Sequence, residues 1–533
     1  MKKLTIVSCV LALLAVWSCG QKHTRAQRLL ENYAQVTIPA PDLSGITDNG
    51  KEVLNLYRFA ADEADAIYWE QVYGAKADFE DWASDAEKEY ALINYGPWDR
   101  IDGKAFIEGF GTRPAGACFY PSDITKEEFD ALDNPDKNSP YTLIRRGPDG
   151  QLEVEWYHQA YAGHVGKIAN YLKAASDITI KTSVRDYLVK KADALQSDNY
   201  YESEKAWLEL SDSKMDLIIG PNEAIDDQLF GLKASYGAYV LLKNQERTDV
   251  LQGLCARLPE YQAALPGDPR FHDFVPGAES NIYACDAIYY GGYTNAGYKV
   301  IAVNFPYDAT LQQELGTRTV LFDNIIREKY NYTVFPLGRV LFEDADASHI
   351  DANAFYFNIV FRELAKGLGV KETINGNGPV ATALGAEALT LEKAKSNVLG
   401  VWLNAREVER HQVEALIQRD DVLATFVASV IRSCRFGAQD ATGKANLIIY
   451  NTLLEEGAIF RQASGRYKLD YDKTLSAITA LGARILEIQA TGNSAAAASL
   501  VEKYAVVTPP LQADIVALEL EKIPVDIRLT FEK

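Results

Sequence analysis

Apolar residues recur at helical spacing in three stretches of the chain. The first begins near Glu155 and the second spans 475–488, and both repeat apolar residues at steps of three or four. The third, Glu407–Phe436, is amphipathic and breaks near Asp420. Because such steps place side chains on one face of a helix, each stretch predicts a helix packed against a core. The apolar positions are Tyr161, Val165, Ile168, Leu172 and Ala175, then Leu475, Ile478, Leu481, Ile485 and Ile488.

Strand-like segments lie before residue 323, and the rest of the chain is mostly helical in pattern. Tyr298–Asn304 alternates and is rich in β-branched residues, and Arg318–Phe322 predicts a second strand. Leu217–Ile219 predicts a short buried strand, which Gly220-Pro221 should turn so that Glu223 lies at its end. Strands and helices together predict an α+β fold.

Length and composition are those of a large globular protein. The chain has 533 residues, of which 47% are hydrophobic and 24% charged, enough for two or three domains of the usual size, about 100–200 residues. The formal net charge is −20. Because the chain is acidic and has no basic stripe with interleaved aromatic residues, we expect no nucleic-acid partner.

The N-terminus has the pattern of an export signal. Basic residues after Met1 precede a short apolar core, Ile6–Val16, which is too short to span a bilayer comfortably. We therefore expect residues 1–18 to be a signal peptide. Small residues before Cys19 resemble a bacterial lipobox, so we expect lipidation of Cys19, a tether over 19–40 and anchoring in the bacterial cell envelope. The alternative is a simple secretory signal cut nearby.

The other cysteines and one acidic loop suggest no metal site. Cys118, Cys255, Cys285 and Cys434 are widely spaced and form no CxxC pair, so free thiols are the expectation, although the sequence does not fix their disulfide state. The loop 344–351 contains three Asp residues and one His at a spacing that fits neither an EF-hand nor a zinc site. We expect a solvated turn there.

Candidate chemistry is concentrated in the segment Phe355–Gly369. Arg362 and Lys366 lie four residues apart, so both fall on one face of a helix with Glu363 beside them. Zinc peptidases use this spacing in His-Glu-x-x-His, where the two His hold the metal and the Glu acts as a base. Arg and Lys are not ordinary zinc ligands at neutral pH. Taken alone, the motif is far more typical of a solvated helix face with an intrahelical ion pair.

Four further segments of the chain resemble, in the same order, segments of a known protein family. With them, the chain resembles the dipeptidyl peptidase III family of zinc metallopeptidases, in particular its bacterial branch, over nearly its whole mature length. The segments are Asp216–Ala234, Ile301–Asp308, Arg432–Gly437 and Ile523–Arg528.

The resemblance implies two lobes with a wide cleft between them. The lower lobe would contain a small five-stranded β core, one strand of which pairs with an extended peptide, and the mostly helical upper lobe would carry the metal-site helices. By this resemblance the lower lobe would comprise 41–240, 281–340 and 505–533, and the upper lobe 241–280 and 341–504.

The resemblance also implies a role for each site position. Arg362, Lys366 and Lys393 occupy the three zinc-ligand positions, whereas Glu363 keeps the position of the base. Glu392 keeps the first Glu of the Glu-Glu-x-x-Ala motif that carries the third ligand. A carboxylate expected beside the metal is Asn397, and a histidine expected to stabilise the transition state is Thr442.

Two substrate-binding positions are retained. The resemblance implies that Glu223 and Asn304 hold the free amino end of a peptide, whereas the Tyr expected two residues after Glu223 is Ile225. Without the resemblance, Glu223 would be a surface carboxylate near a turn and Asn304 a polar strand terminator.

Two explanations of the substituted positions stay open. In the first, Arg362, Lys366 and Lys393 replace the zinc electrostatically by forming ion pairs with Glu363 and Glu392, which would otherwise be buried without compensation. In the second, the surplus positive charge binds an anionic group such as a peptide carboxylate or a phosphate.

The sequence therefore predicts an envelope lipoprotein that resembles dipeptidyl peptidase III but lacks zinc, any other cofactor and peptidase activity. It would bind a peptide or another small extended ligand in the cleft and the membrane through Cys19. One alternative is an active zinc enzyme with a relocated metal site that releases dipeptides from peptide N-termini. Another is a hydrolase that uses Glu363 as a metal-free base.

Overall fold

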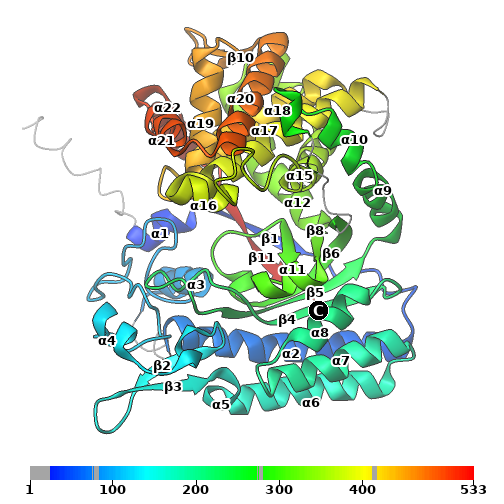
Figure 1. Ribbon diagram of the computed structural model, residues 1–533, viewed down its shortest axis with the longest axis vertical. Helices are drawn as coiled ribbons and strands as arrows, with labels where there is room; N and C mark the ends of the chain where they lie inside the picture. Colours follow the sequence, from blue (N-terminus) through cyan, green and yellow to red (C-terminus); the bar gives the residue numbers. More distant parts are fainter. Residues whose placement is uncertain are drawn as a thin grey trace, which may run out of the picture.

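The computed structural model describes residues 24–74, 76, 83–272, 274, 280–410 and 417–532. The fold is α+β and consists of two lobes, as expected: a lower lobe built around a sheet and an upper lobe of helices (Figure 1). The expected signal peptide and Cys19 lie outside the described residues. From Thr24 onward the expected tether is folded, since α1 and β1 form part of the lower lobe.

Helices and strands alternate irregularly along the chain. Up to the five-stranded sheet they are α1 (Arg25–Leu30), β1 (Tyr33–Ile38), α2 (Asp48–Val72), α3 (Asp85–Asn94), α4 (Lys126–Ala131), β2 (Thr142–Arg146), β3 (Leu152–Trp156), α5 (Tyr157–Ala160), α6 (Ala162–Ile178), α7 (Thr182–Leu195) and α8 (Tyr201–Glu209). The sheet region comprises β4 (Met215–Glu223), β5 (Ser235–Lys243), α9 (Gln245–Cys255), α10 (Leu258–Ala263), β6 (Ser280–Gly292), β7 (Ala302–Phe305), α11 (Ala309–Leu315) and β8 (Thr317–Phe322). There follow α12 (Asp323–Lys329), α13 (Phe335–Leu341), α14 (Asp344–Ala347), α15 (Ala352–Lys366), α16 (Val380–Leu384), α17 (Ala388–Glu409), α18 (Arg419–Cys434), α19 (Ala441–Glu455), β9 (Ile459–Arg461), β10 (Tyr467–Leu469), α20 (Tyr471–Thr491), α21 (Ser494–Tyr504), α22 (Pro509–Leu520) and β11 (Asp526–Phe531).

The sheet of the lower lobe has five strands in the order β4-β5-β6-β8-β7. All neighbours are antiparallel except β6 and β8, which are parallel. Arg318, at the start of β8, donates hydrogen bonds to the carbonyls of Leu208 (2.6 Å) and Leu210 (2.8 Å), which precede β4. Arg318 therefore ties β8 to the segment that leads into β4.

Helix α2 packs closely on this sheet because small residues line the contact. Ala60, Ala61 and Ala64 are fully buried on the helix. A Cβ added at Gly291 of β6 would lie only 2.2 Å from the carbonyl oxygen of Ala61. No other residue fits at Gly291 without moving the helix. This close contact therefore fixes the position of α2 against the sheet.

Several predicted boundaries differ from the observed ones. Strand β4 continues through Gly220-Pro221 to Glu223, with a bulge at its end, because β5 pairs with it throughout. Strand β7 begins only at Ala302, and β8 confirms the predicted strand at 318–322. The helix expected from Glu155 begins at Ala162, since Glu155 belongs to the β2-β3 hairpin.

The other predicted helices are confirmed in the described residues. Helix α20 contains the apolar series 475–488, and Asn493 caps α21 by accepting a hydrogen bond from the amide of Ala496. The amphipathic run 407–436 is divided, since α17 ends at Glu409 and α18 begins at Arg419.

Two hydrophobic cores correspond to the two lobes. The lower core contains residues from Ala26 to Ile325 together with Ile527, and the upper core is dominated by α15 and α17–α20. The expected lobe boundaries remain a prediction. Residues 330–340 and α22, which we expected in the lower lobe, contribute Leu337, Leu511 and other side chains to the upper core.

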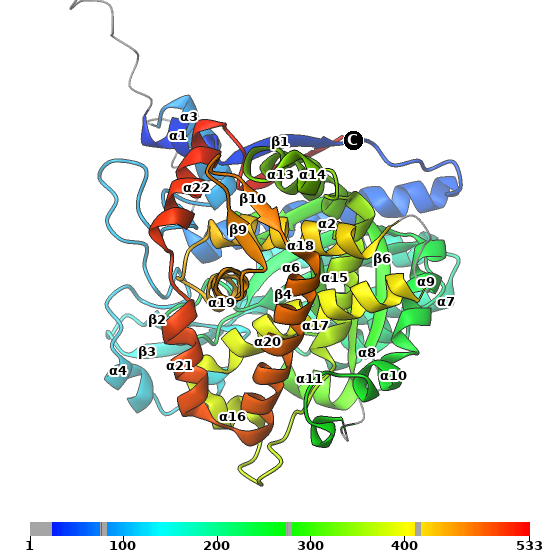
Figure 2. The same cartoon turned by 90° about the horizontal axis from the view of Figure 1, so that it is seen from above.

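Two of the sequence landmarks contact each other at the junction of the lobes. Arg435 donates hydrogen bonds to the carbonyls of Ile523 (2.8 Å) and Pro524 (2.9 Å), and Arg432 donates to that of Val525. Beyond this point β11 pairs in parallel with β1 over six residues, from Tyr33 with Asp526 to Ile38 with Phe531. Figure 2 shows β1 and the C-terminus together at one side of the molecule.

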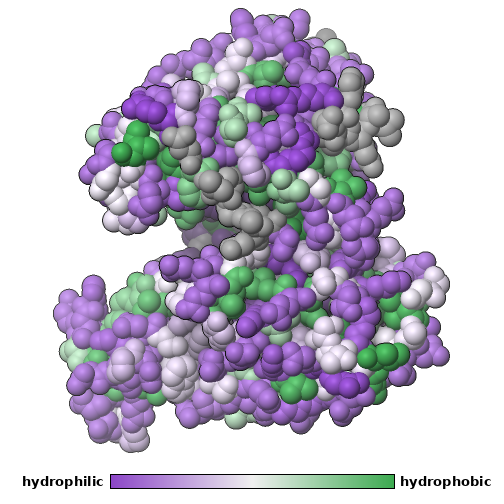
Figure 3. All heavy atoms as spheres, turned by 45° about the vertical axis from the view of Figure 1, so that its right-hand side comes forward, coloured by the Kyte–Doolittle hydropathy of each residue, from purple (hydrophilic) through white to green (hydrophobic). Residues whose placement is uncertain are grey.

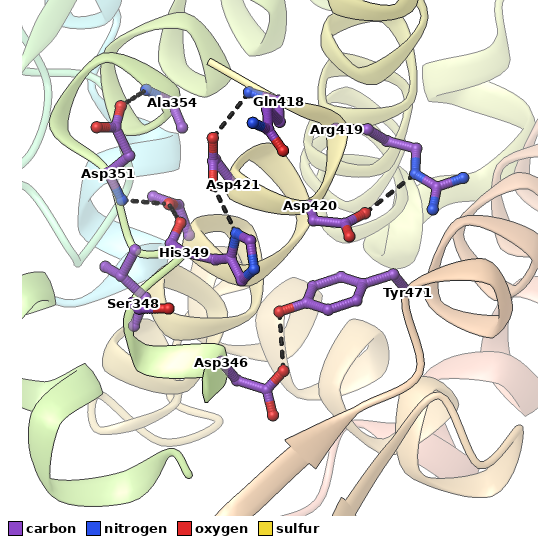
Figure 4. A network of polar contacts seen from close by, with 12 residues as sticks. Asp346, Ser348, His349, Asp351, Ala354, Gln418, Arg419, Asp420, Asp421 and Tyr471 are labelled. Atoms are coloured by element: carbon purple, nitrogen blue, oxygen red, sulfur yellow. Dashed lines mark hydrogen bonds and ion pairs between the residues drawn. The ribbon is translucent and has the colours of Figure 1, made fainter. Parts of the chain in front are cut away.

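The acidic loop at 344–351 is tied into the upper lobe. Asp346 accepts hydrogen bonds from the hydroxyl of Tyr471 (2.8 Å) and the amide of Leu469, and a nitrogen of His349 lies 2.7 Å from Asp421 (Figure 4). Asp351 caps α15. The expectation of a solvated turn was therefore wrong, because these side chains position the helix that carries the site.

Two further features bear on the sequence predictions. Cys118, Cys255, Cys285 and Cys434 are free thiols, as expected. Within the described residues, no helix combines the length and the apolar character needed to cross a membrane.

Candidate functional site

A cavity of about 630 Å³ lies between the lobes, where Figure 3 shows the molecule deeply hollowed. Its upper wall comes from α15, α17, α18 and α19, and its lower wall from residues 299–302, which lead into β7. Although the chain is strongly acidic, six basic and two acidic side chains line this cavity. They are Lys299, Lys329, Arg362, Lys366, Lys393 and Arg432, with Glu363 and Glu392.

Helices α15 and α17 bring the sequence-predicted residues together. They cross in close contact at Gly400, where an added Cβ would lie 2.6 Å from the backbone nitrogen of Arg362. This crossing lies two turns after Lys393 on α17, so the cavity-lining face of α17 continues from the contact with Arg362 toward Lys393.

Glu363 is the buried centre of an ion-pair cluster. Its side chain is 1% exposed, and Arg362 donates to Oε1 (2.8 and 3.1 Å) while Lys366 Nζ lies 2.5 Å from Oε2. Burial alone would raise the pKa of Glu363, but the charges and hydrogen bonds of Lys366 and Arg362 outweigh it and lower this pKa to about 2. Such a carboxylate is a weak base, because an effective catalytic base has a pKa near the working pH.

Glu392 has a different partner from the one we expected. Its Oε1 lies 2.8 Å from Nζ of Lys395 and 3.9 Å from that of Lys371, and Gln489 donates to Oε2. The prediction that Lys393 would pair with Glu392 was wrong. Residues one apart on a helix point about 100° away from each other, whereas residues three apart share a face.

Lys393 points away from Glu392 and lines the cavity. It is half-buried and makes no hydrogen bond or ion pair with any residue that the structure describes. Burial, together with the charges of Lys366 and Arg362, lowers its pKa. Lys393 is therefore a cation held in a positive environment.

Asn397 and Thr442 also line the cavity. Asn397 lies one turn after Lys393 on α17, and Thr442 lies in the first turn of α19. Across the described ranges, neither side chain has a hydrogen-bond partner. Both can donate a hydrogen bond into the cavity.

Glu223 is the last residue of β4 in the lower lobe, and the charges of Lys393 and Lys366 act on its carboxylate. Burial raises its pKa to about 6, and the charges of Lys393 and Lys366 oppose that rise. Its carboxylate makes no hydrogen bond or ion pair with the described part of the chain. Ile225, where the resemblance implies a Tyr, is exposed.

Asn304 lies on β7, the strand at the other edge of the sheet from β4. Its side-chain oxygen accepts a hydrogen bond from Thr319 (3.0 Å), so its amide nitrogen remains available to a ligand. The structure places Glu223 and Asn304 on opposite edge strands of the same sheet, and no contact joins them.

Three basic residues of the cavity were missed by sequence reasoning. Lys329 and Arg432 form ion pairs with buried Asp526 (3.0 and 3.2 Å), and Lys299 donates hydrogen bonds to the carbonyls of Asn295 and Gly297. Burial lowers the pKa of Lys299 to about 7 and that of Lys329 to about 8. In the sequence, the only indication of this network was that Arg432 and Asp526 lie in two of the segments shared with the family.

The residues at the implied ligand positions do not fit zinc. Arg362 and Lys366 offer protonated nitrogens already bound to Glu363, and Lys393 carries a third cation beside them. Zinc requires imidazole, thiolate or carboxylate donors. Elsewhere in the described ranges, no three His, Cys, Asp or Glu side chains gather as a metal site would require.

Comparison with known proteins shows similarity along nearly the whole chain. No family model matches it. The Arabidopsis thaliana protein named Nudix hydrolase 3 is 27% identical over 577 residues, which cover 95% of this chain and 73% of that protein. The structure of dipeptidyl peptidase III from Caldithrix abyssi matches with a TM-score of 0.90 and 30% identity, covering 95% of this chain and 98% of that one. The enzyme of the same name from Corallococcus sp. strain EGB matches with a TM-score of 0.83 and 30% identity, covering 95% and 96%.

Proposed function

Because the chain belongs to the dipeptidyl peptidase III family, we propose that it is a peptide-binding member without zinc-dependent peptidase activity. One observation carries the proposal: both oxygens of Glu363, the residue at the position of the base, are occupied by Arg362 and Lys366, the residues at two metal-ligand positions. With both carboxylate oxygens of Glu363 occupied, the cluster leaves neither an open metal site nor an available base.

The ion pairs give a physical reason for the fold to persist without a metal. A buried carboxylate left without compensation costs several kcal/mol. Arg362 and Lys366 supply that compensation at Glu363, and Lys395 supplies it at Glu392.

Peptide binding is supported by the groups that remain unpaired. Strand β7 is an edge strand beside the cavity, so its backbone can add an extended peptide by β-augmentation. Glu223 has a carboxylate free to bind an amino group, and Asn304 has a free amide nitrogen. We place the protein in the bacterial envelope, anchored through Cys19, on the sequence pattern of residues 1–19.

Metal content tests the proposal directly. The mature protein and an Arg362→His, Lys366→His, Lys393→Glu variant are equilibrated with zinc, freed of unbound metal and assayed for zinc and for dipeptide release. We expect the natural protein to retain none and the variant to retain about one zinc per chain, because the variant regains two imidazoles and a carboxylate. One tightly bound zinc in the natural protein, together with dipeptide release, would contradict the proposal and support a relocated metal site.

A further inference from the structure

The positive charge of the inter-lobe cavity is not fully compensated. Lys329 and Arg432 share Asp526, and Glu392 is satisfied by Lys395. The remaining carboxylate of the cavity lining, Glu363, pairs with Arg362 and Lys366, so with Lys393 the lining residues at this end have two more positive than negative charges. The exposed Asp440, outside the cavity lining, also acts on Lys393.

Among these cations, Lys393 lacks a hydrogen-bond or ion-pair partner in the described residues. Its ammonium group is half-buried and has no acceptor in the described residues, and its nearest charged neighbours include Lys366 and Arg362. A partly desolvated ammonium group without an acceptor is unfavourable. An anion in the cavity would remove that cost.

Two neutral donors lie near Lys393 on the cavity wall. Asn397 follows it by one helical turn, so both share a face of α17, and Thr442 comes from the start of α19. An amide N–H and a hydroxyl beside an ammonium group make a donor set suited to a carboxylate, which only accepts hydrogen bonds.

The opposite charge lies in the other lobe. Glu223 is free of partners in the described chain and is close enough for Lys393 and Lys366 to shift its titration. The lower lobe therefore supplies an unpaired carboxylate at the end of β4, and the upper wall of the cavity supplies an uncompensated ammonium group at Lys393. An extended peptide of two or three residues has its charged ends separated by roughly 7–10 Å, so its two ends can reach groups on different lobes.

We infer that the cleft binds short peptides as zwitterions, with the free α-carboxylate held by Lys393, Asn397 and Thr442 and the amino group directed toward Glu223. This inference rests on the proposed peptide-binding function and adds the recognition of the carboxyl end. It excludes long peptides, whose carboxyl end would lie outside the cavity.

Calorimetry with the mature protein tests the inference. The probes are di-, tri- and tetra-alanine, each as the free acid and as the C-terminal amide. We expect one length to bind as the acid at least about tenfold more tightly than as the amide, because a charge-assisted hydrogen bond is lost in the amide. Lys393→Met should remove this preference by weakening the acid alone. Lys468→Met, which removes an exposed charge on β10, should leave it unchanged.

The outcomes separate this inference from the proposed function. Equal binding of acid and amide at every length would overturn the inference while peptide binding stands. An equal loss of both forms in Lys393→Met would also overturn it, because Lys393 would then serve only the structure. Inorganic phosphate is titrated as a further probe, and if it bound while no peptide did, both the inference and the proposed function would fail.

Discussion

Lys366 Nζ lies 2.5 Å from Oε2 of Glu363, yet the two side chains differ in exposure: 51% for the lysine and 1% for the glutamate. The pair is therefore asymmetric. The glutamate depends on its partners for compensation, whereas the lysine is already hydrated.

This asymmetry predicts that removing the two cations lowers the free energy of unfolding more than removing the carboxylate does. Arg362→Met with Lys366→Met should lower the free energy of unfolding by about 3 kcal/mol, since it leaves a buried carboxylate without compensation. Glu363→Gln should lower it by about 1 kcal/mol, because the cations left behind reach solvent. Urea denaturation measures both values, and Lys468→Met serves as a control for loss of a lysine. Equal costs would show that Glu363 does not depend on its neighbours.

The same cluster predicts a loss of stability in acid. The pKa of Glu363 is lowered from 4.5 to about 2 in the folded protein, so its contribution is complete above the unfolded-state pKa and declines as the pH falls toward 2. The difference in unfolding free energy between the natural protein and Glu363→Gln should be constant above about pH 5 and shrink below it. Denaturation curves at pH 7, 5, 4 and 3 measure it, and a difference that grew in acid would contradict the assignment.

Peptide affinity should depend on the ionisation of Glu223. Because burial raises its pKa to about 6, only about one tenth of the protein has this carboxylate ionised at pH 5, and affinity should fall about tenfold from its value at high pH. Glu223→Gln should bind weakly and without this dependence. An N-acetylated peptide, which lacks the ammonium group, is the control. A pH profile that was flat in the natural protein would rule out Glu223 as the partner of the amino group.

Arg435 should control the attachment of the C-terminal strand. Arg435→Met removes two charged hydrogen bonds to the carbonyls of Ile523 and Pro524 and should cost about 2–3 kcal/mol of unfolding free energy. Arg435→Lys, which keeps the charge and one donor, should cost less. Hydrogen exchange should accelerate in 526–531 and in the paired strand 33–38. If exchange became faster only in α20, Arg435 would not be what attaches the C-terminal strand.

Sequence periodicity predicted several elements of the fold because their signals are local. Helix α20 has an uninterrupted apolar series, and strand β8 has β-branched residues bounded by Gly316 and a helix. The Arg362, Glu363 and Lys366 cluster also follows from spacing on one helix.

Other features depend on contacts that a linear pattern does not contain. Lys299 and the Lys329-Asp526 pair reach the cavity through tertiary packing between distant segments. The partner of Glu392 was predicted wrongly for a different reason. The three-residue spacing from Glu392 to Lys395 was present in the sequence and favoured Lys395 over Lys393 as the partner. The early end expected for β4 was wrong because pairing with β5 overrode the turn preference of Gly220-Pro221.

The pairing of β1 with β11 sets the order in which the molecule can be completed. Tyr33–Ile38 is among the first folded segments to leave the ribosome, but its partner, Asp526–Phe531, is among the last. The edge of the first strand therefore stays open throughout synthesis, and contacts of such long sequence separation form slowly. The β1-β11 pair forms only after residues 526–531 have emerged, and a chain that ends before them would keep an open strand edge able to pair with other chains.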